Sequence, residues 1–176
     1  MVIGLFGKLP SHGDFVRRHL PESFVRPWDD WLQAGIIAAR QTLGHEFDGL
    51  ARRAPAWRFR LPRGACGQSA VAGILLPSQD IVGRFFPLTV GAVFSDDSQA
   101  PCRGWYDALA RGTPDGLDAR LGADSLLANL ASFLQHDFAQ EDVTPAEGWW
   151  TDADLVWSLP ALPAPAEFYI LMQGGA

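Results

Sequence analysis

The sequence contains only two cysteines, Cys66 and Cys102, among its 176 residues. Two cysteines are too few for a disulfide framework, and neither belongs to a C-x-x-C pair that would bind a metal or act in redox chemistry. No stretch approaches the ~20 consecutive apolar residues that a membrane-spanning helix needs, so an integral membrane protein is not expected. The first residues lack a basic segment followed by an apolar run, which argues against a secretory signal. We therefore expect a cytoplasmic protein.

Basic residues are scarce as well, because 14 Lys and Arg stand against 20 Asp and Glu, for a net charge of −6. Residues 1–63 carry ten of the basic residues and six acids, whereas residues 64–176 carry four arginines and fourteen acids. An acidic chain without a dense basic stripe binds nucleic acid poorly, so no nucleic-acid partner is expected. The uneven charge either steers a protein partner or simply solvates the surface.

Apolar and aromatic residues are abundant, with 48% hydrophobic residues, seven Trp and eleven Phe. This composition and length are typical of a globular protein, and we expect a single domain spanning residues 1–176. Most of the large aromatic side chains should fill the core, and any that is left exposed would mark an interface.

Hydrophobic periodicity predicts an α/β (α+β) fold, in which a mixed, mostly antiparallel sheet carries helices on its faces. Apolar residues recur every three or four positions from Phe24 to Leu43, which predicts a helix with Pro27 in its first turn. Three runs at 57–61, 70–76 and 86–94 predict an antiparallel meander, with alternating Arg making the first strand half exposed. Further helices are expected at about 103–111 and 124–138. Residues 2–6 form another predicted strand, and residues 7–21 are expected to be irregular.

The Gly7-Lys8 pair suggests a phosphate-binding loop, but its surroundings argue against one. A P-loop has a Gly five positions before its second Gly and a Ser or Thr after its Lys. The corresponding positions hold Val2 and Leu9. Nucleotide hydrolysis is therefore not predicted.

His12 and Asp14 form a second candidate pair, since a carboxylate can orient an imidazole for base catalysis or metal binding. Residues this close in a Gly-rich loop more often make local turn hydrogen bonds. The four histidines show no metal-ligand spacing, and residues 67–71 lack the closing Gly of a serine nucleophile elbow. We therefore favour a structural or binding loop, with no catalytic residue, no metal and no cofactor.

Arg84 lies at the turn before the third strand of the meander. Its guanidinium either clamps an anion or forms an ion pair with an acid such as Asp14. The ion pair would make residues 8–15 and 77–86 one surface.

Three motifs occur in a specific order along the chain. They are Gly7-Lys8-Leu9-Pro10-Ser11-His12-Gly13-Asp14-Phe15, then Pro27-Trp28-Asp29-Asp30-Trp31-Leu32, then Pro77-Ser78 followed by Val82-Gly83-Arg84-Phe85-Phe86-Pro87-Leu88. Together with Trp149-Trp150 and Leu159-Pro160, this set resembles the TagF (also called ImpM) family of type VI secretion-associated proteins, over nearly the whole chain.

The resemblance implies a cytoplasmic bacterial regulator of the type VI secretion system. It implies a post-translational repressor that binds the forkhead-associated (Fha) scaffold protein, with other secretion subunits as further possible partners. The residues expected to contact a partner or to shape that surface are Lys8, Ser11, His12, Asp14, Phe15, Trp28, Trp31 and Arg84.

Two other functions stay open at the level of sequence. One is a small hydrolase or ligand-binding domain that uses Lys8, His12, Asp14 and Arg84 around a pocket. The other is a structural component of the secretion apparatus, which would copurify with its subunits in fixed proportion.

Overall fold

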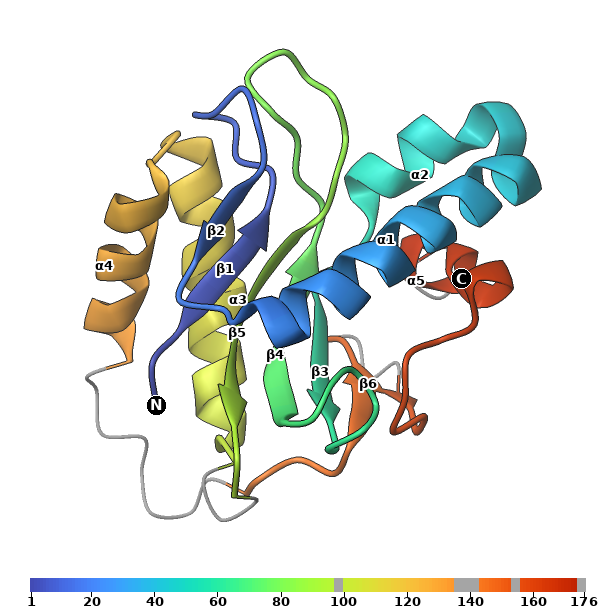
Figure 1. Cartoon of the computed structure of the whole chain (residues 1–176). Helices are drawn as coiled ribbons and strands as arrows, with labels where there is room; N and C mark the ends of the chain where they lie inside the picture. Colours follow the sequence, from blue (N-terminus) through green and yellow to red (C-terminus); the bar gives the residue numbers. More distant parts are fainter. Residues whose placement is uncertain (97–99, 135–142, 153–155, 174–176) are drawn as a thin grey trace.

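The computed structural model of the chain describes residues 1–96, 100–134, 143–152 and 156–173 (Figure 1). Within these residues, seven strands form one sheet in the order β2-β1-β5-β4-β3-β6-β7, and every neighbouring pair is antiparallel. The strands are β1 (Gly4–Gly7), β2 (Val16–Arg18), β3 (Trp57–Leu61), β4 (Ala70–Leu76), β5 (Leu88–Phe94), β6 (Gly148–Trp150) and β7 (Val156–Trp157). The predicted fold class is confirmed, and so is the meander, which is formed by β3, β4 and β5.

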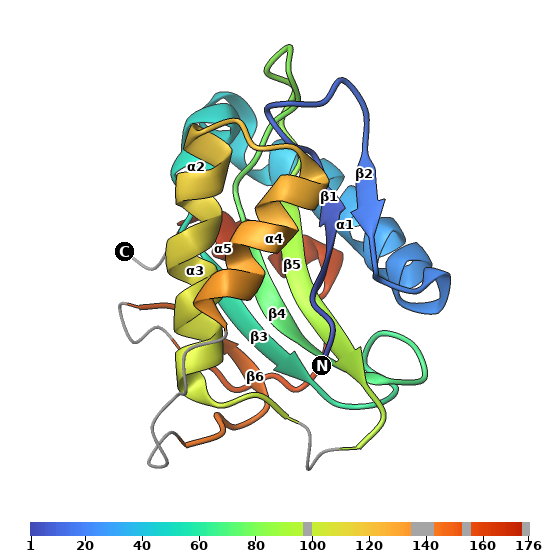
Figure 2. The ribbon, with the colours of Figure 1, turned by 90° about the vertical axis from the view of Figure 1, so that its left-hand side faces the viewer.

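Helices cover both faces of the sheet (Figure 2). The α-helices are α1 (Glu22–Leu43), α2 (Phe47–Arg53), α3 (Arg103–Asp118), α4 (Ala123–Phe133) and α5 (Tyr169–Gln173). One apolar cluster lies between the sheet and α3 and α4, and a second, rich in aromatic rings, lies between the sheet and α1, α2 and α5. In the described part of the chain, no helix is both long and apolar enough to cross a membrane.

Two local predictions are wrong. Residues 7–21 are not wholly irregular, because β2 pairs with β1 over Val16–Arg18. The strand β3 is not half exposed, because it lies between β4 and β6 with helices on both faces, and Arg58 is buried there. The Nη2 atom of Arg58 forms ion pairs with Asp107 and Asp152, which offset part of the cost of burying this guanidinium.

The start of α1 also differs from the prediction. The helix begins at Glu22, so Pro27 lies inside it rather than in its first turn. Glu22 is the acidic residue near the positive end of the helix dipole. Because Pro27 has no N–H, the Ser23 carbonyl lacks its helical donor.

Candidate functional site

The loops 8–15 and 77–87 lie side by side at one end of the sheet, at the top of Figure 1. Because β1 runs antiparallel to β5, the end of β1 lies beside the beginning of β5. Gly7 permits this close approach: its φ is +140°, and a Cβ there would lie 2.3 Å from the Pro87 carbonyl oxygen. The Ile81 N–H donates to the His12 carbonyl at 2.9 Å, which joins the two loops as expected.

The carboxylate of Asp80 is at the centre of this contact. Its Oδ2 atom accepts hydrogen bonds from Lys8 Nζ at 3.0 Å and from Arg84 Nε at 2.6 Å. Its Oδ1 atom accepts the backbone N–H groups of Val82, at 3.1 Å, and Arg84, at 2.9 Å. We call Lys8, Asp80 and Arg84 the Asp80 clasp. The clasp links the two loops through a carboxylate whose side chain is completely buried.

The protonation of Asp80 follows from these contacts. Burial by itself would raise the pKa of the Asp80 carboxyl. The hydrogen bonds from the Arg84 N–H, the Lys8 ammonium and the Arg84 guanidinium outweigh that effect and hold the pKa well below its usual range. Asp80 is therefore ionised at neutral pH, with each oxygen accepting two donors.

Arg84 forms an ion pair with an acid, which is one of the two predicted roles, but the acid is Asp80 and not Asp14, the example suggested from the sequence. Arg84 pairs with Asp80 and donates from Nη2 to the Gly13 carbonyl at 2.9 Å. The carboxylate of Asp14 instead accepts the N–H of the next residue, Phe15, at 2.7 Å, so its hydrogen bond stays local to the loop. Sequence alone contained a signal for Asp80, because Asp followed three residues later by Gly83 is typical of a side-chain-capped turn.

His12 is oriented by Ser11. The Ser11 hydroxyl donates to the Leu121 carbonyl at 2.8 Å and lies 2.9 Å from His12 Nδ1. Because the hydroxyl has only one proton, we assign Nδ1 of His12 as the donor in this pair. Ser11 therefore ties the loop to the turn between α3 and α4, and no imidazole–carboxylate pair forms between His12 and Asp14.

Phe15 lies partly on the surface, with 46% of its area exposed. Its ring contacts Phe86 edge to face, with centroids 4.7 Å apart, and Lys8 Nζ lies 5.3 Å from the ring centroid. The ring thus covers one side of the Asp80 clasp while it stays accessible to a partner.

Trp28 and Trp31, predicted for the same surface, are buried in the aromatic cluster beneath the sheet. Trp28 Nε1 donates to Thr89 Oγ1 at 2.7 Å, and Trp31 Nε1 donates to the Pro163 carbonyl at 2.8 Å. The structure therefore separates the predicted residues into two groups. One comprises Arg84 and the residues of the loop 8–15, of which Lys8 is buried, and the other comprises two indoles in the core.

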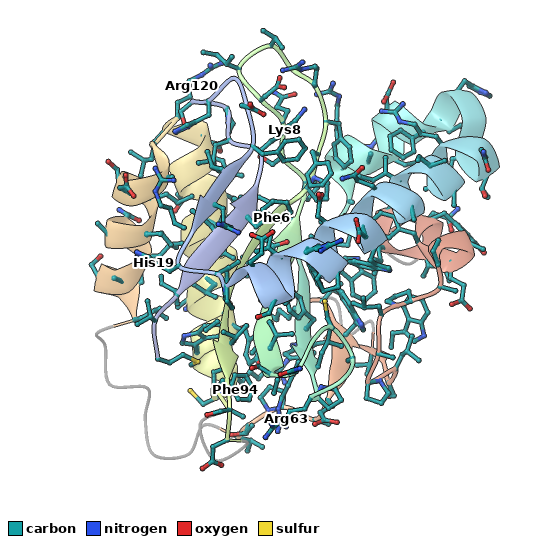
Figure 3. All side chains as sticks on the ribbon, in the orientation of Figure 1. Phe6, Lys8, His19, Arg63, Phe94 and Arg120 are labelled. Atoms are coloured by element: carbon teal, nitrogen blue, oxygen red, sulfur yellow. The ribbon has the colours of Figure 1, made fainter. Side chains whose placement is uncertain are left out.

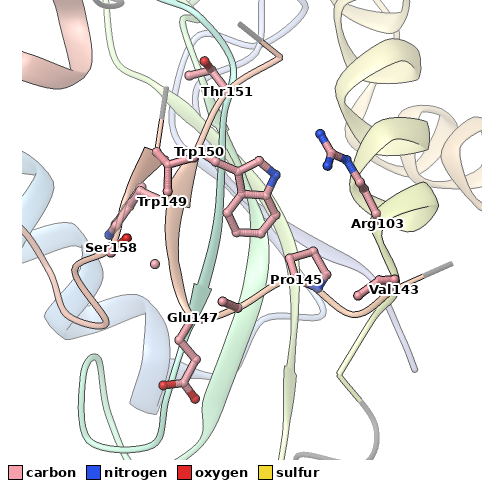
Figure 4. Close-up of a pocket in the computed structure, with 11 residues that line it drawn as sticks. Arg103, Val143, Pro145, Glu147, Trp149, Trp150, Thr151 and Ser158 are labelled. Atoms are coloured by element: carbon pink, nitrogen blue, oxygen red, sulfur yellow. The ribbon is translucent and has the colours of Figure 1, made fainter. Parts of the chain in front are cut away.

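Among the cavities in the structure, one lies near these loops and another lies away from them. One, of about 280 Å³, lies beside the Asp80 clasp and is lined by residues that include Pro10, Arg52, Ser78, Phe85 and Asp118. The other, of about 270 Å³, lies at β6 and contains none of the predicted residues; Trp150 and Arg103 face it in Figure 4. Among the described residues, no cluster of three His, Cys, Asp or Glu side chains could hold a metal ion.

Comparison with known proteins gives two matches. The family described as TagF N-terminal domain, type VI secretion system-associated, matches residues 4–133. Among solved structures, the crystal structure of PA0076 from Pseudomonas aeruginosa PAO1 is similar, with a TM-score of 0.78 and 28% sequence identity, over 99% of this chain and 95% of that chain. No curated protein matches the sequence.

Proposed function

The chain belongs to the TagF family of type VI secretion-associated proteins, and from this premise we propose that it is a cytoplasmic, non-enzymatic repressor of the secretion system. Repression works through binding of the forkhead-associated (Fha) scaffold protein. Family membership supports the accessory role in type VI secretion. The binding mode is supported by one observation, the Asp80 clasp, which fixes the loops 8–15 and 77–87 as one rigid, partly apolar surface.

The contacts of the clasp favour binding over hydrolysis. A general base needs a lone pair free to take a proton, but each Asp80 oxygen already accepts two donors. Lys8 is only 8% exposed, and its ammonium lies between the Asp80 carboxylate and the ring of Phe15. His12 and Asp14 make separate local bonds. The groups that a hydrolase would use are thus engaged in holding the loops.

Binding to purified Fha protein, measured by isothermal titration calorimetry, tests the proposal. Arg84→Ala removes a guanidinium that lies on this surface, and it should weaken binding at least ~10-fold, the effect of losing about 1.4 kcal/mol. Lys8→Ala should weaken it as well, because the two loops lose a shared contact.

Arg63→Ala is the matched control. Arg63 is another exposed arginine that donates to main-chain carbonyls, those of Gln68 and Ser95, and it lies at the opposite end of the molecule from Lys8 (Figure 3). Its variant should bind Fha like the wild type. Absence of binding by the wild type, or equal binding by the Arg84 and Arg63 variants, would contradict the proposal.

A further inference from the structure

The turn from Asp80 to Arg84 presents two apolar side chains to solvent. Ile81 is 56% exposed and Val82 is 71% exposed, at the tip of the loop between β4 and β5. Exposed apolar residues are ordinary when they are scattered singly, but two adjacent ones on a turn tip form a small patch.

The backbone of this turn is closed by four hydrogen bonds. The Asp80 N–H donates to the Arg84 carbonyl at 3.1 Å, and the Gly83 N–H donates to the Asp80 carbonyl at 2.9 Å. The Asp80 carboxylate accepts the Val82 and Arg84 N–H groups. Gly83, with φ +85°, takes the left-handed position that the turn requires. Ile81 and Val82 are therefore held in place before any partner arrives.

Such preorganisation lowers the entropy lost on binding. Immobilising a side chain or a loop on binding costs conformational entropy, which reduces the binding free energy. A rigid turn with β-branched side chains has already lost most of this conformational freedom on folding. Covering a rigid, exposed apolar pair therefore contributes favourable binding free energy, as expected of an anchor residue in an interface.

The patch continues onto the loop 8–15. Ile81 lies next to Gly13, because a Cβ added to Gly13 would be 3.9 Å from Ile81 Cγ2. The Ile81 N–H also donates to the His12 carbonyl. Phe15, with 46% of its area exposed, lies on the same loop. Both loops therefore contribute apolar surface at this end of the sheet.

Arginines surround the patch. Arg52, Arg84 and Arg120 donate to main-chain carbonyls of the two loops: Arg52 Nη2 to Gly83 at 3.2 Å, Arg84 Nη2 to Gly13 at 2.9 Å and Arg120 Nη1 to Pro10 at 3.4 Å. Within the described part of the chain, Arg52 and Arg120 form no ion pair with a carboxylate. With Lys8, these arginines supply four positive charges against the three carboxylates of Asp14, Asp80 and Asp118, so this end of a chain with net charge −6 has a small positive excess.

We propose that Ile81 and Val82 are the anchor residues of the partner contact, and that they enter an apolar pocket on a protein partner whose rim carries carboxylates facing Arg52, Arg84 and Arg120. This inference rests on the proposed function and identifies the residues that perform it. Charge complementarity points to an acidic protein surface. A bilayer fits less well, because the remainder of the chain is acidic and a two-residue tip buries too little apolar area for stable anchoring.

The test compares two double variants of the full chain in calorimetric titrations with purified Fha protein. Ile81→Ala/Val82→Ala removes the proposed anchor. Ile37→Ala/Val2→Ala removes an Ile and a Val of nearly equal exposure, 59% and 70%, that lie away from the two loops. We expect the anchor variant to bind at least ~30-fold more weakly and the control variant to bind within ~3-fold of the wild type. Wild-type affinity should fall as salt is raised from 50 to 300 mM, because the arginine rim is screened.

The outcomes separate the two proposals. If the wild type does not bind Fha, the proposed function fails and this inference fails with it. If the wild type binds and the anchor variant binds equally well, the proposed function stands and the anchor assignment is overturned. Sedimentation with vesicles containing phosphatidylserine provides a further check. Wild-type binding to these vesicles that the anchor variant loses, with Fha binding intact in both, would assign the tip to a lipid surface and overturn the inference.

Discussion

One substitution tests how the C-terminal segment packs onto the rest of the fold. Gly35 lies on the buried side of α1, against the ring of Phe168, and a Cβ at this position would lie 2.3 Å from Phe168 Cδ2. Phe168 is only 2% exposed, so its ring has little room to move. Gly35→Ala should therefore push the segment 165–173 away from α1.

Two effects of opposite sign decide the result. Replacing Gly by Ala inside a helix stabilises by about 1 kcal/mol when the space is open. Overpacking a buried site costs about 1–3 kcal/mol, and a contact as short as 2.3 Å belongs at the upper end of that range. The net expectation is a loss of about 2 kcal/mol, or a decrease in Tm of about 4–8 °C for a chain of this length.

Thermal unfolding followed by circular dichroism measures this change, and Gly49→Ala is the matched control. Gly49 lies inside α2, and an added Cβ would meet only the flexible guanidinium of Arg53, at 3.5 Å. The control should raise Tm by a few degrees. If Gly35→Ala raised Tm as much as the control, the segment 165–173 would not pack against α1 as described.

Three further predictions concern the core, the clasp and the cysteines. Trp28→Phe removes the indole N–H that donates to Thr89 and should lower the free energy of unfolding by about 1–3 kcal/mol, as measured by denaturant titration. Its affinity for Fha, measured by calorimetry, should not change. Weaker binding by the fully folded variant would show that Trp28 takes part in the partner contact. Because the pKa of Asp80 is held low, its contribution to stability is complete above the ordinary carboxyl pKa of about 3.9 and is lost as the pH falls toward the lower folded-state pKa. Asp80→Asn should therefore flatten the acid side of the plot of unfolding free energy against pH. An unchanged plot would refute the role of Asp80 in the clasp. Burial raises the pKa of the Cys66 thiol to about 12, so iodoacetamide at pH 8 should modify the half-buried Cys102 faster than Cys66 in the folded protein, as peptide mass spectrometry would show; preferential modification of Cys66 would contradict its burial.

Much of the fold could be predicted because its signals are local. The continuous apolar run of β4 and the helical stripe of α1 identify these elements without knowledge of their neighbours. The strand β2 could not be found in this way, because two of its three residues are arginines and it is stabilised by pairing with β1. The burial of Arg58 could not be predicted for a similar reason, because its partner Asp107 lies on α3, far away in the sequence.

In the candidate site too, the local features could be predicted and the long-range contacts could not. The sequence predicted that an ion pair of Arg84 would make residues 8–15 and 77–86 one surface, and that Asp14 would bond locally within its loop, as it does to the Phe15 N–H. The sequence indicates a turn at Asp80 but not its contact with the loop 8–15, because that contact is made by Lys8, 72 residues away in the sequence. The exposure of Ile81 and Val82 is equally a product of the folded turn, since an apolar pair in sequence more often predicts a buried strand.

Hydrogen–deuterium exchange of the chain with and without purified Fha protein tests the binding surface most directly. Backbone amides of residues 8–15 and 77–87 should exchange more slowly in the complex, while amides of α4 and β6 should be unaffected. Protection confined to other elements, or the absence of any protection at saturating Fha, would contradict the proposal that these loops form the partner-binding surface.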